Sequence, residues 1–228
     1  MGKARLEILW PRTIDEASRL QEELSARVRI GPLKSRVRFV AGVDAAFSPD
    51  GAFAAACLFS YPGLELEEET TAIEKIAFPY VPAYFAFREG PAVLRALSGL
   101  KTKADLILVD GQGTAHPRGI GIASHLGVLL GLPTIGCAKS RLVGECAEPG
   151  LKKGSWSPLL YGGKIVGAVM RTRDGIRPLF VSPGHKIDLE KSLEFVLACV
   201  RSFRIPEPLR RADWLSKIAK KRWAAVRI

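Results

Sequence analysis

The sequence predicts an α/β fold, in which a mixed β-sheet is flanked by helices within one domain over residues 1–228. Two patterns indicate this fold. Apolar segments joined by turn residues come first and favour an antiparallel meander, and strand–helix–strand alternation follows and favours parallel βα units. The chain contains no internal repeat, low-complexity tract or long linker. This favours one domain, although 228 residues are enough for two small ones.

The first predicted element is a helix that begins after Thr13. Thr13 and Glu16 form the pattern of a capping box, in which each side chain accepts a hydrogen bond from the other residue's backbone amide. Four apolar residues then recur at helical spacing and predict the buried face of the helix: Ala17, Leu20, Leu24 and Val28.

An antiparallel meander is predicted next. Two apolar runs within Phe39–Ser60 flank Pro49-Asp50-Gly51, a strong turn signal, and together they predict a hairpin. A third antiparallel strand is expected over Thr70–Ala77. The glutamates between residues 65 and 69 are expected in an exposed, turn-like segment that faces away from any phosphate.

A parallel unit is predicted for the middle of the chain. The apolar run Asp105–Asp110 predicts a strand that is buried on both faces, and residues 120–130 predict a helix that Gly131 ends. Pro133–Ala138 is then the next strand. We expect this strand–helix–strand unit to be parallel and to have a right-handed crossover.

The remaining elements are one further hairpin and three helices. Pro91 suits the first position of a helix over Pro91–Leu100. Lys164–Arg171 and Arg177–Ser182 flank an Asp-Gly turn and predict the hairpin. Asp188 predicts the N-cap of a helix that runs to about residue 203, and a final basic helix is expected after a Pro-Glu-Pro sequence at residues 206–208.

The composition indicates a globular protein with a polyanionic partner. The net charge is +11, from 34 Lys and Arg against 23 Asp and Glu, which suits nucleic acid, although such an excess also serves solubility alone. Between Arg27 and Arg38 the segment is basic and contains no acid. No apolar run approaches the roughly 18 residues of a membrane helix, so no membrane partner is expected.

The four cysteines predict a reducing compartment. They lie far apart and form no C-x-x-C pair, so neither a disulfide framework nor a zinc site is expected. The first ten residues lack the apolar core of a secretory signal. We therefore expect a cytoplasmic location.

Three acids stand out because apolar sequence surrounds them. Asp44 lies within the first predicted strand, where an ionised carboxylate needs a partner, a proton or a metal ion. Asp110 ends a strand at the sheet edge where α/β proteins bind ligands, and Glu89 begins the helix that Pro91 introduces. Together they form a hard-oxygen set that suits Mg²⁺ or Mn²⁺ and, with the basic charge, metal-assisted phosphodiester hydrolysis.

Each acid also has an ordinary structural explanation. Asp110 is followed by glycine and suits a simple turn, and Glu89 suits the positive end of a helix dipole. Asp213, on the last predicted helix, is a candidate fourth acid, for which surface exposure is the stronger interpretation.

Two unusual segments accompany the acids. The glycine-rich loop Gly111–Gly119 leaves backbone amides free, and its His116 and Arg118 can contact phosphate. Lys139 directly follows a strand and is expected at the same sheet edge as Asp110. The segment Phe78–Glu89, stiffened by two prolines and rich in aromatics, predicts either a plug in the core or a rigid wedge that stacks on bases.

These motifs resemble the endonuclease V family, whose fold is ribonuclease H-like. The resemblance runs from about Thr13 to Asp213. It rests on ordered blocks, which are Val40–Asp44, Pro79–Pro82, Phe87–Glu89, Val109–Gly113, Ala115–Arg118, Pro133–Gly136, Ala138–Ser140 and Ser182–His185.

The resemblance implies a DNA repair endonuclease that uses Mg²⁺, with Mn²⁺ as a substitute, and acts at deoxyinosine. The implied reaction cuts the second phosphodiester bond 3′ to the lesion and leaves 3′-hydroxyl and 5′-phosphate ends. DNA that contains deoxyinosine is therefore the expected partner, and inosine-containing RNA stays open as a second one. A monomer is expected.

The resemblance also assigns roles to residues. Asp44, Glu89 and Asp110 match the catalytic metal ligands, while Asp213 stays a candidate. The residues that match positions close to the scissile phosphate are His116 and Lys139, and the wedge is Pro79, Tyr80, Val81 and Pro82, with Tyr80 as the strand-separating side chain. The implied base pocket consists of Ala83, Phe85, Gly111, Gly113, Ile122 and Gly136. The implied phosphate contacts are Arg88, Arg118, Ser140 and His185.

One stretch departs from the family pattern. The family usually has a glycine and small aliphatic residues after the wedge, where this chain has Ala83-Tyr84-Phe85-Ala86, so the base specificity stays open. Three alternatives also stay open. They are another ribonuclease H-like nuclease, such as an excision-repair, flap or RNA-specific enzyme, a catalytically inactive nucleic-acid-binding relative, and a basic globular protein whose acids are structural.

Overall fold

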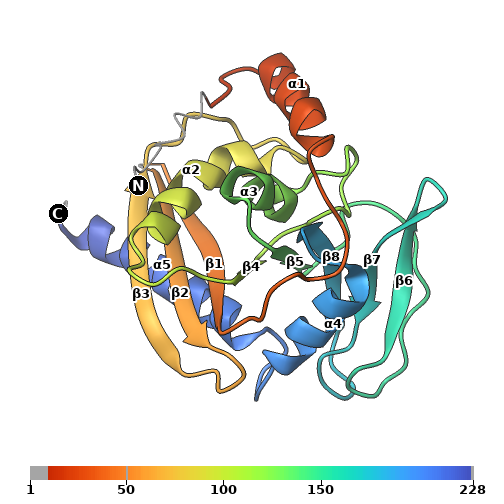
Figure 1. Cartoon of the computed structure of the whole chain (residues 1–228). Helices are drawn as coiled ribbons and strands as arrows, with labels where there is room; N and C mark the ends of the chain where they lie inside the picture. The colour runs from red at the N-terminus through yellow and green to blue at the C-terminus, as the bar shows by residue number, and fades with distance from the viewer. Residues whose placement is uncertain (1–9, 50, 227–228) are drawn as a thin grey trace.

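A computed structural model describes residues 10–49 and 51–226 and contains one mixed β-sheet (Figure 1). Its strand order is β3-β2-β1-β4-β5-β8-β7-β6. The strands are β1 (Phe39–Ser48), β2 (Gly51–Ser60), β3 (Leu66–Glu74), β4 (Leu106–Val109), β5 (Thr134–Ala138), β6 (Trp156–Tyr161), β7 (Lys164–Met170) and β8 (Leu179–His185). The helices are α1 (Ile14–Ser25), α2 (Phe85–Ser98), α3 (Ile122–Leu130), α4 (Leu189–Ala198) and α5 (Glu207–Val226).

Both predicted halves of the sheet are present. The first three strands form the antiparallel meander, and β1, β4 and β5 run parallel. The parallel register pairs Val43 of β1 with Val109 of β4. The residues that come directly after Val43 and Val109 therefore lie at the same edge of the sheet. The predicted α/β fold is therefore confirmed. The turn residue Asp50 and the N-terminal residues 1–9, on which the signal-sequence expectation rests, lie outside the described residues.

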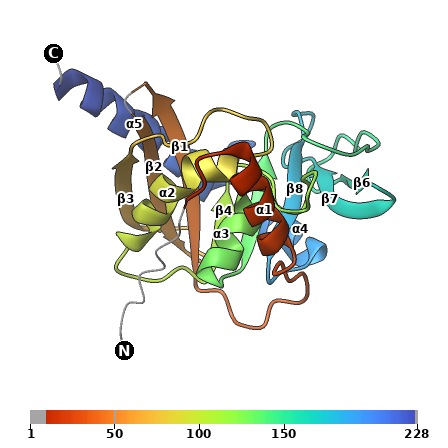
Figure 2. The same ribbon diagram turned by 90° about the horizontal axis from the view of Figure 1, so that it is seen from above.

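Helices cover both faces of the sheet. Figures 1 and 2 show α2 and α3 on one face, with α1 lying over them, and α4 and α5 on the other. Strands β4 and β5 are fully buried and carry apolar side chains on both faces. Such strands need cover on each face of the sheet, and the helices provide it. One buried cluster lies between the strands and the small residues of α2 and α3, and another lies between the strands and the apolar faces of α4 and α5. No helix among the described residues is long and apolar enough to cross a membrane.

Helix α5 lies unusually close to the sheet at Gly42. A Cβ atom at this position of β1 would lie 2.1 Å from the backbone carbon of Pro208, near the start of α5. Glycine therefore permits a backbone-to-backbone contact that no other residue would allow. This contact fixes where the rest of α5 passes over β1.

Several boundaries differ from the sequence predictions. Helix α2 begins at Phe85, so Pro91 lies inside it and Glu89 lies in its second turn. The apolar face of α2 continues across the proline, and we attribute the helix to burial of that face, which outweighs the lost hydrogen bond. The acidic segment expected as a turn belongs to strand β3, where Glu69 forms an ion pair with Arg211 of α5 at 2.6 Å.

The C-terminal half shows two more differences. The sequence pattern did not predict strand β6. Its apolar residues are largely exposed, and buried and exposed residues do not alternate along it. Helix α4 ends at Ala198 rather than near residue 203, while its predicted N-cap is correct, because Asp188 accepts a hydrogen bond from the Lys191 backbone amide at 2.8 Å. The capping box of α1 is also present.

Candidate metal centre

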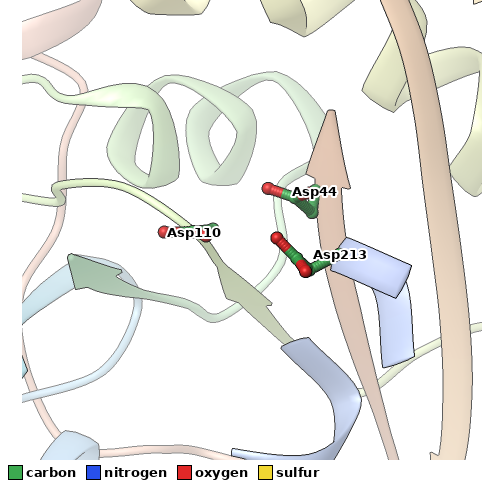
Figure 3. A group of neighbouring side chains, drawn as sticks. All are labelled: Asp44, Asp110 and Asp213. Carbon is green, nitrogen blue, oxygen red and sulfur yellow. The ribbon is translucent and has the colours of Figure 1, made fainter. Parts of the chain in front are cut away.

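Three aspartates from three elements converge at the carboxyl edge of the parallel strands. Asp44 comes from β1, Asp110 follows β4 directly, and Asp213 comes from α5. One carboxylate oxygen of each lies within 4.8 Å of the others, and all three side chains are half-buried. Figure 3 shows the carboxylates pointing toward one another. The exposed surface position that the sequence favoured for Asp213 is therefore wrong.

Local structure explains the convergence. The parallel pairing of β1 and β4 lets the Asp110 amide donate to the Val43 carbonyl oxygen at 3.3 Å, which places Asp110 beside Asp44. Asp213 joins them because the close contact at Gly42 guides α5 across β1. On the same helix, Ser216 donates a hydrogen bond to Asp44 Oδ2 at 3.0 Å.

A fourth carboxylate, Glu89, lines the same cavity from α2 but is not part of the 4.8 Å group. Burial, together with the charges of Asp44 and Asp110, raises the pKa of Glu89 to about 8. Burial likewise raises the pKa of Asp44 to about 7, with added repulsion from Asp110 and Asp213. Burial is the larger cause for both groups, and repulsion among the acids adds to it.

Two ammonium groups contact this cluster among the described residues. Lys217 of α5 donates to both carboxylate oxygens of Asp213, at 2.8 and 2.7 Å. Lys139, immediately after β5, lies 2.5 Å from Asp110 Oδ2 and 3.8 Å from Asp213 Oδ1. Burial opposes its positive charge, but the attraction of Asp110 prevails and the pKa of Lys139 is raised. Two ammonium groups against four carboxylates still leave an excess of hard oxygen donors. This donor set fits a divalent cation, which would lower the proton affinity of the acids.

A cavity of about 350 Å³ opens beside the acids. Four of the predicted base-pocket residues line it, namely Ala83, Phe85, Gly111 and Ile122. Gly113 and Gly136 are not among the lining residues. A Cβ at Gly136 would lie 2.4 Å from the Gly113 amide nitrogen, and one at Gly113 would lie 2.1 Å from the Pro183 carbonyl oxygen. These two glycines let the loop pack on β5 and β8 and so support the cavity from behind.

The proline-rich segment before α2 projects from this cavity. Tyr80 is 69% exposed, although the packing of an aromatic ring would normally bury it. Its ring lies 5.1 Å from that of Phe85, whose residue lines the cavity. The guanidinium of Arg88 lies between the segment and β1, 5.9 Å from the Tyr80 ring and 4.9 Å from the Phe47 ring. The segment is therefore anchored at its base with an aromatic ring free at its tip.

The backbone carbonyl of Ala83 is the junction between this segment and the glycine-rich loop. His116 Nε2 lies 2.8 Å from the Ala83 oxygen, and Gln21 Nε2 of α1 also donates to it at 2.8 Å. Burial lowers the pKa of His116 to about 4, so the ring is neutral. Because a carbonyl only accepts, Nε2 carries the proton, and Nδ1 accepts from the Arg118 amide at 3.2 Å.

Comparisons with known proteins identify the family. A family model described as Endonuclease V matches residues 22–214. The chain belongs to the endonuclease V family. It is 50% identical to an endonuclease V of Trichormus variabilis over 210 residues, which cover 91% of this chain and 95% of the relative.

Solved structures agree with this family. The endonuclease V of Streptomyces avermitilis is 44% identical, with a TM-score of 0.91 and coverage of 95% of this chain and 96% of that one. The endonuclease V of Ciona intestinalis, solved with a 24-nucleotide DNA containing an inosine followed by a ribo-adenosine, is 32% identical, with a TM-score of 0.82 and coverage of 92% and 98%.

The departure from the endonuclease V pattern at Ala83 has a structural cost. Its φ is +67°, in the left-handed region, where glycine is the ordinary residue and an alanine costs roughly 1–2 kcal/mol. The hydrogen bonds that Gln21 and His116 donate to its carbonyl hold the residue there.

The predicted phosphate contacts do not share one place. Ser140 lines the cavity, whereas Arg88 and Arg118 are engaged in packing, the latter through Gln21 Oε1 at 2.6 Å and the ring of Tyr84. His185 lies at the opposite edge of the sheet. Strand β8 runs antiparallel to β5 and pairs His185 with Thr134, at the amino end of β5. This residue is therefore not beside the acids, and its phosphate contact stays a prediction.

The sequence predictions missed four residues of this site. Gln21, Gln112 and Arg141 line the cavity, and Ser216 bonds Asp44. Two of them had a recognisable signal. Gln21 occupies the buried face of α1 between Ala17 and Leu24, where a polar side chain needs a partner. Ser216 is three residues after Asp213 on one helix face.

Proposed function

We propose that this chain is a divalent-metal-dependent endonuclease that recognises deoxyinosine in DNA and hydrolyses the second phosphodiester bond 3′ to it, leaving 3′-hydroxyl and 5′-phosphate ends. The observation that carries the proposal is the meeting of Asp44, Asp110 and Asp213 within 4.8 Å beside a cavity that the wedge segment borders. Family membership adds to it, and so does the inosine-containing DNA bound to the Ciona intestinalis relative.

Asp44, Asp110 and Asp213, with Glu89 beside them, are the residues that would hold the metal. Mg²⁺ is the expected ion because it prefers oxygen ligands and needs only one or two of these carboxylates, and Mn²⁺, which prefers similar ligands, is expected to substitute. A bound divalent ion supplies Lewis-acid stabilisation of negative charge on phosphate oxygens and activation of water.

The chain's own groups orient the substrate. Lys139 presents an ammonium at the acid cluster, where it can attract a phosphate oxygen once the carboxylates are engaged elsewhere. The cavity between Ala83 and Gly111 accepts the everted base, and Tyr80 stacks in the gap that the base leaves. Neutral His116 fixes the Ala83 carbonyl and therefore the wall against which the base rests.

Cleavage mapping tests the proposal. Duplexes that carry inosine, xanthine, uracil or no lesion at one position are incubated with and without Mg²⁺, and the product ends are mapped. We expect one cut in the inosine strand, dependent on Mg²⁺ and lost in Asp110→Asn. The matched control is Asp174→Asn, an acid of the turn between β7 and β8 that accepts from the Lys153 amide. Equal cutting of the undamaged duplex would refute the inosine specificity, and cutting by Asp110→Asn would refute the site.

A second substrate class enters the same experiment. The relative from Ciona intestinalis was crystallised with a ribonucleotide directly after the inosine. Strands with deoxyribose or ribose at that position, and an all-RNA strand, therefore measure the preference between DNA and inosine-containing RNA. We further propose that the enzyme acts as a cytoplasmic monomer, which size-exclusion chromatography with light scattering and the location of a tagged chain test.

A further inference from the structure

A second cavity lies at the other end of the parallel strands. It measures about 720 Å³, and we call it the amino-edge groove because its walls are the segments that precede β1, β4 and β5. The residues that matter for its chemistry are Arg29, Ile30, Lys34, Lys103, Leu132 and Lys186. Since the acids lie at the carboxyl ends of the same strands, the groove opens on the opposite edge of the sheet (Figure 1).

The groove is strongly positive. Arg29, Lys34, Lys103 and Lys186 line it with exposed side chains, and none of them has a carboxylate partner among the residues that the structure describes. Asp105 is the acid that lines it, and its Oδ2 already accepts the Arg38 and Phe39 backbone amides at 2.8 and 3.0 Å.

Some cations elsewhere in the protein do have acid partners. Arg210, Arg211 and Lys217 of α5 each form an ion pair with an acid. Burial lowers the pKa of His185, and the positive charges of Lys186 and Arg29 also lower it. The positive potential of the groove therefore extends to this residue.

Apolar surface separates the cations. Ile30 is 49% exposed, and Leu132 lines the same groove. Two hydrogen bonds hold the walls together, from the Lys186 amide to the Arg29 carbonyl oxygen and from Lys186 Nζ to the Gly131 carbonyl oxygen at 2.6 Å. Cations spaced around an apolar floor match a sugar-phosphate backbone, in which charged phosphates alternate with apolar sugar faces.

We propose that the amino-edge groove binds the backbone of a second nucleic-acid segment, separate from the one that is cut. A chain of this length has a radius of gyration of roughly 17 Å, whereas duplex DNA resists bending over about 150 base pairs. A single short duplex therefore cannot reach both edges of the sheet. The groove extends the proposed function, since it would let one enzyme hold an inosine site and a neighbouring duplex together.

A capture experiment tests this proposal. A short inosine duplex is immobilised and saturated with Asp110→Asn protein, which cannot cut, and a labelled duplex without inosine is then added. The first step tests the proposed function alone. If the protein is not retained on inosine DNA, that function is overturned. The groove is then tested by direct binding of the undamaged duplex to free protein.

The variant for the second step is Lys34→Glu/Lys103→Glu, whose side chains are exposed and belong to segments at the opposite edge of the sheet from the acids. The matched control is Lys152→Glu/Lys164→Glu, which changes the charge equally at exposed lysines near β6 and β7. We expect the groove variant to lose at least about tenfold in capture affinity, and its salt slope to fall by about 2, while cutting of a short inosine duplex in the otherwise wild-type chain is unchanged.

Two outcomes would overturn the proposal. One is capture that is absent, or equal in the groove variant and the control. The other is capture of an acidic polypeptide such as polyglutamate in preference to the duplex, which would assign the groove to an acidic protein partner instead.

Discussion

The side-chain amide of Gln21 donates a hydrogen bond to the backbone carbonyl oxygen of Ala83 at 2.8 Å. The bond joins α1, which contributes no acid to the site, to the wall of the cavity beside the acids. Gln21 is almost fully buried, and its Oε1 also accepts from Arg118 Nε at 2.6 Å. One side chain therefore holds the wedge segment and the glycine-rich loop at a common position.

Replacing Gln21 with alanine should weaken both the fold and substrate engagement. The Ala83 oxygen keeps its hydrogen bond with His116. The partly buried guanidinium of Arg118 loses its hydrogen-bond acceptor, which costs about 1–3 kcal/mol in the free energy of unfolding. We expect KM for inosine DNA to rise more than kcat falls. Urea unfolding and steady-state cleavage measure the two effects, and Glu22→Ala, an exposed neighbour, is the control.

Replacing Ala83 with glycine should stabilise the protein. The left-handed conformation costs alanine roughly 1–2 kcal/mol, while glycine loses about 0.5–1 kcal/mol through greater freedom in the unfolded chain. The net gain is about 0.5–1 kcal/mol, measurable as a higher urea midpoint. Ala224→Gly, on the exposed face of α5, should instead cost up to about 1 kcal/mol. A lower midpoint for Ala83→Gly would show that the methyl group contributes to packing.

Removal of the Tyr80 ring should weaken binding to inosine DNA with little effect on folding. The ring is 69% exposed, so its loss leaves the core intact. Base stacking is worth about 1–3 kcal/mol, which corresponds to roughly 5- to 160-fold in affinity. Fluorescence anisotropy measures the affinity for inosine DNA, with each Tyr80 substitution made in the Asp110→Asn protein so that the DNA is not cut. Tyr80→Phe should retain most of the affinity, and equal affinities for Tyr80→Ala and its parent would exclude a stacking role.

Loss of the Ser216 hydroxyl should shift the pH dependence of cleavage. Its hydrogen bond to Asp44 opposes the effect of burial and holds the pKa of Asp44 lower than it would otherwise be. Ser216→Ala should therefore raise that pKa, so that protons compete better with the metal ion. We expect the rate to fall about tenfold near pH 6 and much less near pH 9. A uniform loss at all pH values would indicate a purely structural role.

The metal-free protein should become less stable as pH rises from about 6.5 to 8. In the folded state the pKa of Asp44 is about 7 and that of Glu89 about 8, whereas both titrate near 4 when the chain unfolds. The folded state therefore holds more protons within this window, and the free energy of unfolding falls as they are lost. Below about pH 6.5 the buried histidines His116 and His125, whose pKa is lowered to about 4, act in the opposite direction. Urea unfolding in EDTA at pH 6.5 and pH 8 measures the fall in the free energy of unfolding. The double variant Asp44→Asn/Glu89→Gln should remove the dependence.

Much of this arrangement was predictable because it depends on short-range sequence. Asp44 and Asp110 each lie in or after an apolar strand, and parallel strands present their carboxyl ends at one edge. The same rule placed Lys139 after β5, where it contacts Asp110. These residues needed only the strand pattern and the strand–helix–strand unit.

The contacts that the sequence did not reveal depend on tertiary packing. Asp213 reaches the acids only because α5 docks on β1 at Gly42, and neither segment carries a local sign of the other. The place of His185 at the opposite edge could not be predicted, because the direction of β8 relative to β5 cannot be inferred from either strand alone. The helix around Pro91 was misjudged because burial of its apolar face outweighed a local propensity.

The docking of α5 also has a consequence in time. During translation every strand of the sheet is made before this helix, so a nascent chain can pair β1 with β4 and still lack both Asp213 and the hydroxyl beside Asp44. The cluster of three aspartates is therefore complete only after α5 has been synthesised and has docked on β1.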